Sequence, residues 1–138
     1  MNPQRSGAPR SAEEERNLQS VLAFYDTVIK QGHFERAGEW IDASYKQHKP
    51  VVRDGPEGVL DFVRGEHKRV PGHVVEVVRA FVDGDYVFLH VHVHLQPREA
   101  DRAVMDIFRC RNGRLLEHWD VDEPVPPPEK FAHSNGMF

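Results

Sequence analysis

The sequence predicts an α+β domain, with helices in its first part and an antiparallel sheet in its second. Before His73, apolar residues recur at the spacing of amphipathic helices. From His73 onward, apolar and polar residues alternate, which is the period of a strand. Asp83-Gly84 and Asn112-Gly113 separate these alternating runs, and both dipeptides favour the tight turn of a hairpin. A doubly wound sheet would instead alternate strands with helices.

Length and composition fit one small domain. The chain has 138 residues, of which 39% are apolar and 29% charged. The formal net charge of -4 gives no general attraction to nucleic acid or to anionic membranes. The single cysteine, Cys110, excludes an internal disulfide. No apolar run has the length of a membrane span or a signal peptide, so we expect a cytoplasmic protein. We expect a flexible tail at residues 1–10, one domain at 11–138 and a proline-rich C-terminal stretch at 124–138.

The first helix has clear start and stop signals. Ser11 and Glu14 have the spacing of a capping box, and Gly32 is a favoured residue just past a helix end. A second helix is expected at 34–41, and residues 44–50 are interpreted as a connection. A third helix is expected between Asp54-Gly55-Pro56 and Pro71-Gly72. The apolar stripe of the first helix contains Leu18, Val21, Leu22, Tyr25, Val28 and Ile29.

Four strands are expected, at 73–82, 85–95, 102–110 and 114–121. In the second of them, one face carries valine and leucine. The other face carries Tyr86, Phe88, His90, His92 and His94, so neither looks like a wetted surface. We therefore expect both faces of this sheet to be covered, one of them by a second subunit.

Polar residues on the later strands carry the functional hypothesis. Asp106 shares a strand face with Phe108, and His118 shares one with Asp120. A buried carboxylate is costly unless it is paired or protonated. If the polar faces of the neighbouring strands coincide, one cavity holds His90, His92, Asp106, His118 and Asp120. Such a set could move protons near neutral pH.

Two other interpretations of these residues stay open. The aspartates could cap or bridge loops, and His118 could be a hydrogen-bonded core histidine. The spacing His90-x-His92-x-His94 could also present imidazoles to zinc, with His118 or Asp106 completing the site. Three histidines in line along one strand converge on an ion only with strain. We therefore assign no metal.

Several motifs resemble the SnoaL-like polyketide cyclases of the nuclear transport factor 2-like superfamily. The strongest is the closing hairpin, with D-I-F-R at 106–109, N-G-R at 112–114 and E-H-W-D-V at 117–121. Weaker matches are Q-H-K-P at 47–50, where the family usually has asparagine in place of the lysine, H-V-H at 90–92 and N-G-M-F at 135–138. The similarity runs from about residue 18 to the end of the chain. The nearest group is described as predicted aldol-condensation enzymes.

The resemblance implies a cone of helices against a strongly curved, mostly antiparallel sheet that encloses a pocket. It implies a homodimer through the convex face, and ring closure by aldol condensation without metal or organic cofactor. Asp120 matches the family's acid/base aspartate, Asp106 the place of an assisting histidine, and His48 lies near an amide-bearing residue that binds the substrate carbonyl. Related epoxide hydrolases also use a carboxylate at the Asp120 position, with an arginine and an aspartate near the places of His90 and His92.

The leading hypothesis is a cofactor-independent enzyme acting on a hydrophobic carbonyl compound, by aldol cyclisation, isomerisation or dehydration. Asp120 would take the proton α to a carbonyl, His48 or His92 would donate a hydrogen bond to the enolate oxygen, and Asp106 would pair with a histidine. Alternatives are a small-ligand-binding protein without chemistry and a metal-dependent lyase or hydrolase that uses the histidines. Residues expected to contact the substrate are His90, His118, Tyr45, Phe108 and Tyr25.

Overall fold

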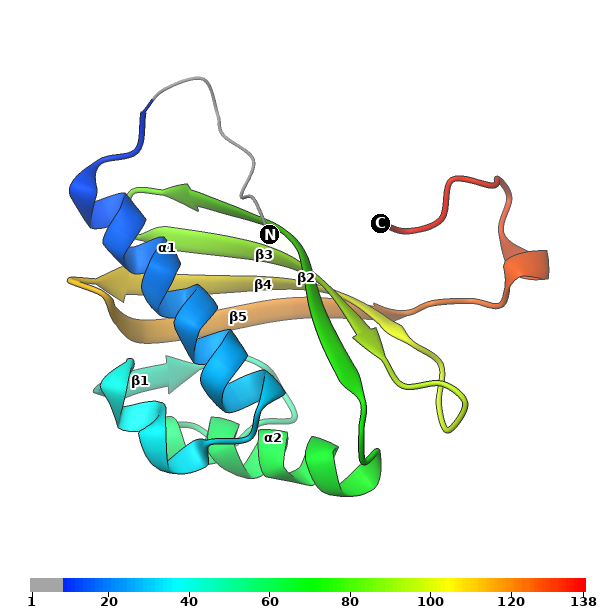
Figure 1. Cartoon of the computed structure of the whole chain (residues 1–138), viewed down its shortest axis with the longest axis horizontal. Coiled ribbons are helices and arrows are strands. Elements are labelled where there is room, and N and C mark those ends of the chain that lie inside the picture. Colours follow the sequence, from blue (N-terminus) through cyan, green and yellow to red (C-terminus); the bar gives the residue numbers. More distant parts are fainter. Residues whose placement is uncertain (1–8) are drawn as a thin grey trace.

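A computed structural model describes residues 9–138, and its architecture is α+β, as predicted (Figure 1). A mixed five-stranded sheet has the order β1-β5-β4-β3-β2, and helices α1 and α2 lie over one of its faces. We call this helix-covered side the inner face and the opposite side the outer face. The predicted tail at 1–10 lies almost entirely outside the described residues.

Helix α1, Ala12–Phe24, begins at the predicted capping box. The Ser11 side chain accepts a hydrogen bond from the backbone of Glu14, whose carboxylate accepts one from the backbone of Ser11. At Tyr25 the helix widens into a π-helical segment, Tyr25–Lys30, which ends just before Gly32 at a φ of 76°. Helix α1 contacts β2, β3, β4 and β5, so its apolar stripe covers most of the sheet.

The segment after α1 differs from the prediction in two ways. The expected second helix at 34–41 is a shorter 3-10 helix, Phe34–Glu39. The expected connection at 44–50 begins inside a strand, β1, which spans Ile41–Gln47 and pairs in parallel with β5. A register shift between Ile41 and Lys46 interrupts the pairing of this strand, and Ala43 is exposed between the buried Ile41 and Tyr45, so the two-residue period is incomplete.

Helix α2, Pro56–Arg69, contacts β1 and covers the end of the inner face at which β1 lies. Pro56 occupies the first turn, where its missing N–H would be unpaired in any case. Two residues later, Gly58 passes so close to the chain that a Cβ built there lies 1.6 Å from the backbone oxygen of Arg53. This close approach ties the start of α2 to the loop that follows β1.

The four predicted strands form an antiparallel meander. Their bounds are β2 Val74–Asp83, β3 Tyr86–His94, β4 Arg102–Arg111 and β5 Arg114–Pro124. Both predicted hairpin turns are present, with positive φ at Gly84, Asn112 and Gly113. After β5, a short 3-10 helix, Pro128–Lys130, precedes a segment that turns back toward the outer face (Figure 1).

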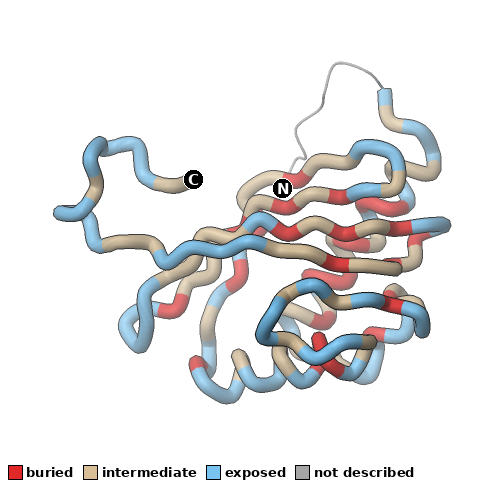
Figure 2. The backbone as a smooth tube through the Cα atoms, turned by 180° about the vertical axis from the view of Figure 1, so that it is seen from behind, coloured by how far each residue is buried: buried red, intermediate tan, exposed pale blue. Residues whose placement is uncertain are grey.

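The hydrophobic core lies between α1, α2 and the inner face. Buried residues alternate with less buried ones along the central strands (Figure 2). Fully buried members include Leu18, Val21, Val28, Ala80, Val87, Leu89, Cys110 and Leu115. No helix among residues 9–138 combines the length and the apolar character needed to cross a membrane.

Two glycines of α2 give a matched test of this packing. Gly58→Ala should lower the free energy of unfolding by about 1–3 kcal/mol, because the methyl group must displace the backbone of Arg53. Gly65→Ala, where a Cβ meets nothing within 4 Å, should raise it by about 0.5–1 kcal/mol through helix propensity. Urea unfolding of both variants measures the difference, and equal effects would show that the contact with Arg53 is unimportant.

Candidate functional site

A cavity of about 130 Å³ lies between the helices and the inner face. One part of its wall is apolar, and most of the polar groups belong to β1 and Lys49 after it, to β4 and to β5. Its apolar lining is formed by Phe24, Ile29, Val52, Val59, Phe62, Val63, Val75, Val91, Val93, Val104 and Phe108. Its polar lining is formed by Tyr25, Tyr45, Gln47, Lys49, Glu66, His73, Arg102, Asp106, His118, Asp120 and Asp122.

Asp106 is a buried carboxyl group with partners for both of its oxygens. Oδ1 lies 2.6 Å from Nε2 of His118, and Oδ2 accepts a hydrogen bond from the Tyr25 hydroxyl. Asp106 and His118 are only 5% and 6% exposed. Burial and the neighbouring Asp106 raise the pKa of Tyr25 well above its usual value, so the phenol stays protonated and acts as a donor. Tyr25 is also the first residue of the π-helical segment, a feature common at functional sites.

The hydrogen bonds around Gln47 determine the tautomer of His118. The backbone N–H of Lys49 donates to Oε1 of Gln47 at 2.9 Å, so this oxygen is the acceptor that faces Nδ1 of His118 at 2.8 Å. Nδ1 must therefore carry a hydrogen. Nε2 and Asp106 then share one further proton, which makes either an imidazolium–carboxylate pair or a neutral pair. Gln47 itself is oriented by its bond to the Tyr45 hydroxyl, at 3.2 Å.

Asp120 lies beside this group and is held by a lysine. Nζ of Lys49 is 2.8 and 3.0 Å from the two oxygens of Asp120 and 2.9 Å from Asp122. Burial raises the pKa of Asp120, and the hydrogen bond from Lys49 offsets part of that effect. Burial opposes the charge of Lys49, but its bonds to both aspartates outweigh this and raise its pKa. The site thus contains a carboxylate with a raised pKa next to a fixed ammonium group.

The structure brings together six of the nine predicted site residues. Asp106, His118 and Asp120 have a ligand-type atom each within 4.8 Å of one another. The predicted contact residues Tyr25, Tyr45 and Phe108 line the same cavity, and the Phe108 ring lies 4.7 Å from that of His118. The pairing of Asp106 with a histidine was also expected, and that histidine is His118.

The expectation that His90 and His92 share this cavity is wrong. The pairing of β3 with β4 sets Leu89 opposite Asp106 and His90 opposite Met105, so the histidines lie on the outer face. The inward positions of β3 belong instead to residues such as Val91 and Val93. His90 is bonded to Arg79, and His92 lies 2.8 Å from Asp101.

The expected pocket position of His48 is wrong as well. Its Nε2 lies 2.8 Å from Glu117, and its ring stacks on Trp119 at 4.8 Å. Both partners belong to the outer face, because Trp119 alternates with His118 and Asp120 along β5. The pocket residues that flank His48 in the sequence are Gln47 and Lys49, which point the opposite way.

Gln47 and Lys49 are residues of the candidate site that the sequence analysis did not assign. Tyr45, Gln47 and Lys49 occur at every second position, which is the spacing of one strand face. The sequence therefore contains the alternation of a strand at these positions. It was overlooked because residues 44–50 were interpreted as an irregular connection, in which alternate residues need not share a face. The lysine is also the residue at which the Q-H-K-P segment departs from the family pattern.

The Lys49–Asp120 pair predicts how the pKa of Asp120 responds to mutation. Lys49→Met should raise this pKa further, because the ammonium that favours the carboxylate is removed while burial remains. A ¹³C NMR titration of the aspartate carboxyl carbons measures the change. Lys46→Met, at an exposed position three residues away, should leave the pKa of Asp120 as it is. An unchanged value in Lys49→Met would contradict the contact.

Comparisons with known proteins agree with the geometry of this fold. The SnoaL-like domain family matches residues 21–118. A search of curated proteins finds no significant match. A structure described as a candidate SnoaL-like polyketide cyclase of Jannaschia superposes with a TM-score of 0.71 at 19% identity, covering 85% of this chain and 92% of that one.

Two further structures carry different descriptions. A candidate ketosteroid isomerase of Kribbella flavida has a TM-score of 0.69 at 15% identity, covering 93% of this chain and 96% of that one. A LEH-like epoxide hydrolase of M. tuberculosis has a TM-score of 0.64 at 18% identity, covering 80% and 84%. At these identities the likeness shows the fold alone. Because the family match covers most of the described chain, the protein belongs to the SnoaL-like domain family.

Proposed function

We propose that this protein catalyses acid/base chemistry on a hydrophobic carbonyl compound without a cofactor. One observation carries the proposal: a partly buried carboxyl group with a raised pKa, Asp120, lies beside the ammonium of Lys49 in a largely apolar cavity. A raised pKa makes a carboxylate a stronger base, and the neighbouring cation can stabilise the anion that forms when a carbon acid loses a proton.

In the proposed first step, Asp120 removes a proton from the carbon α to a carbonyl. The carbonyl oxygen becomes an enolate oxygen, and Lys49 donates a hydrogen bond to it. Lys49 thereby takes the role that the sequence analysis gave to His48 or His92, both of which lie on the outer face. Protonated Asp120 then returns its proton to carbon or to oxygen, which restores the starting state.

The fate of the enolate defines the reaction. Attack on a second carbonyl of the same molecule closes a ring by aldol addition. Return of the proton at another carbon isomerises the compound, and loss of a β-hydroxyl group dehydrates it. The pair of Asp106 and His118 holds a proton at the other end of the polar group, where it can be given to a new alkoxide or to a leaving hydroxide.

Fixed partners keep this second acid in place. Tyr25 donates to Asp106, and Gln47 accepts from His118, so the shared proton is held between Nε2 and Oδ1. We assign Tyr25 and Gln47 as positioning residues. Phe108 packs against His118, and with Tyr25 and Tyr45 it offers the substrate an aromatic wall.

A second candidate function is binding of a small hydrophobic ligand without turnover. It is favoured by the saturation of the polar groups, since Asp106 already bonds Tyr25 and His118, and Asp120 already bonds Lys49. The ligand would then contact mainly the apolar wall. The metal-dependent alternative of the sequence analysis used the histidines of β3, which lie outside this cavity. A metal in the cavity would instead need Asp106, His118 and Asp120 as ligands, and it would compete with the ammonium of Lys49 for Asp120.

We also propose that the protein forms a homodimer through its outer face. Apolar residues are unusually exposed there: Val121 is 71% exposed and its cross-strand partner Met105 is 37% exposed. Adjacent exposed apolar side chains on a sheet face are typical of an interface. Size-exclusion chromatography with light scattering of the wild type and of Val121→Glu would distinguish a dimer from a monomer.

Deuterium exchange tests the chemistry without knowledge of the natural substrate. The wild type should speed the exchange of α-protons in hydrophobic ketones and 1,3-diketones in D₂O, followed by ¹H NMR. Asp120→Asn should reduce the rate by about 10²- to 10⁴-fold, because amide nitrogen and oxygen are poor bases. Asp61→Asn, on the exposed side of α2, is the matched control and should retain wild-type exchange.

Three outcomes separate the candidates. Equal exchange in wild type and Asp120→Asn would overturn the role of Asp120. Saturable ligand binding, seen as chemical-shift changes at Phe108 and Val91 without exchange in any panel member, would favour the binding protein. Exchange that is lost with a chelator and restored by added metal would favour the metal-dependent alternative.

A further inference from the structure

We propose that the outer face carries a separate binding site for a divalent metal of the zinc class, with Glu76, His92 and His94 as ligands. Each of these residues offers one ligand atom, and the three atoms lie within 4.8 Å of one another. Two imidazoles and one carboxylate form a donor set typical of zinc sites with an open position. The site is independent of the chemistry proposed for the inner cavity.

Strand pairing places the three ligands next to one another. His92 and His94 are two residues apart on β3, so both project from the outer face, and Glu76 is the direct partner of His92 on β2. The rings of His92 and His94 already stack at 3.7 Å, and Nε2 of His94 lies 2.9 Å from Glu76. Zinc bonds of about 2.0–2.2 Å require ligand atoms about 3.4 Å apart, so rotations of side chains are enough to close the site.

His92 has the supporting partner that a metal-bound histidine normally needs. Its Nε2 lies 2.8 Å from Asp101, whose other oxygen accepts from the backbone N–H groups of Leu95 and Gln96 at 2.8 and 3.1 Å. A carboxylate that is bonded to one ring nitrogen orients the ring and leaves the other nitrogen, here Nδ1, for the metal. Asp101 is thus assigned as a positioning residue.

The third histidine of the run does not belong to the site. His90 is engaged by the guanidinium of Arg79, and burial together with that charge lowers the pKa of His90. A cation so close would repel a metal ion. Strand β3 therefore supplies two histidine ligands, His92 and His94. This agrees with the expectation that three histidines in line along a strand cannot easily bind one ion.

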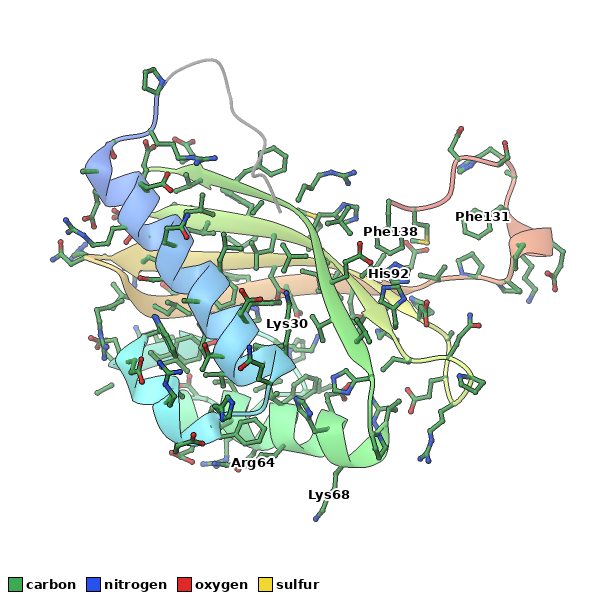
Figure 3. All side chains as sticks on the ribbon, viewed as in Figure 1. Lys30, Arg64, Lys68, His92, Phe131 and Phe138 are labelled. Carbon is green, nitrogen blue, oxygen red and sulfur yellow. The ribbon has the colours of Figure 1, made fainter. Side chains whose placement is uncertain are left out.

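The site is open to solvent in the single chain, and its ligands on β2 and β3 are separate from the exposed Met105 and Val121 of β4 and β5. The His92 and His94 side chains are 19% and 38% exposed, and that of Glu76 is 55% exposed. Water can therefore complete the coordination, and a metal can enter without opening the core. Figure 3 shows the ring of Phe138 beside His92, and the two rings stack at 4.1 Å. A bound metal would link β2, β3 and, through Asp101, the loop between β3 and β4, beneath the C-terminal segment.

Calorimetric titration of the tag-free, chelator-treated full chain with ZnCl₂ at pH 7.5 tests the site. We expect one equivalent to bind, and His94→Ala to weaken binding at least tenfold. Asp101→Asn should weaken it about 10- to 100-fold, as expected for loss of a partner that orients a ligand. His133→Ala, an exposed histidine outside the cluster, is the matched control and should bind as the wild type does. Co²⁺ should give the visible absorption of a tetrahedral site, and this band should be absent in His94→Ala.

Stability gives a second readout that does not depend on calorimetry. A saturating concentration of Zn²⁺, about 100 times the dissociation constant, should raise the melting temperature of the wild type by roughly 5–10 °C and that of His94→Ala by much less. His94→Ala should fold, since the side chain it removes is partly exposed. Circular dichroism without metal checks this.

Three results would overturn the proposal. The first is the absence of wild-type binding up to 1 mM ZnCl₂, and the second is binding that is the same in the wild type and His94→Ala. The third is loss of binding in Asp120→Asn with retention in His94→Ala, which would place the metal in the inner cavity instead. Loss in His94→Ala with retention in Asp120→Asn supports the outer site and leaves the proposed proton chemistry unaffected.

Discussion

The arrangement of the site depends on the burial of one carboxyl group, that of Asp106. A buried carboxyl group without partners would destabilise the fold by several kcal/mol, so its neighbours must supply donors. They come from different elements: the Tyr25 hydroxyl from the π-helical end of α1, and His118 from β5. His118 in turn requires Gln47 from β1. The polar group therefore fixes α1, β1, β4 and β5 relative to one another at the base of the cavity.

The pleat of the sheet explains why the polar residues form two separate groups. Neighbouring residues of a strand point to opposite faces, so a difference of one position decides between the cavity and the outer face. Asp106 pairs with Leu89, and His90 pairs with Met105. The histidines of β3 therefore gather on the outer face beside Glu76, while the carboxylates of β4 and β5 gather on the inner face with His118.

The sequence alone predicts the fold class and those elements whose signals lie within a few neighbouring residues. The capping box at Ser11 and the hairpin turn at Asn112-Gly113 need only a few neighbouring residues, and both are found where predicted. Strand β1 was missed because its regularity is broken by a register shift, and its pairing with β5 is distant in the sequence. The closing hairpin likewise predicts that Asp120 and His118 share a face, since alternation within one strand is local.

Local sequence signals do not show which faces of neighbouring strands lie on the same side of the sheet. Alternation gives the two faces of each strand but not the register between strands, and register decides whether His92 faces Asp106 or turns away from it. His48 was misplaced for a related reason, because its direction depends on whether the segment that contains it is extended. Once β1 is known, Tyr45, Gln47 and Lys49 point inward together and His48 points outward.

For the proposed reaction, the charges at the cavity favour a neutral substrate and a charge that moves only a short distance. Lys49 bonds Asp120 and Asp122, and Arg102 bonds Asp122, so in this cluster of the cavity wall two cations face two carboxylates. A charged substrate would upset this balance in a partly buried site. In the proposed first step, a proton passes from a neutral carbonyl compound to Asp120, and the negative charge moves from the carboxylate to the enolate oxygen. The ammonium of Lys49 can bond either anion with little movement, so the stabilising group is in place before the reaction begins.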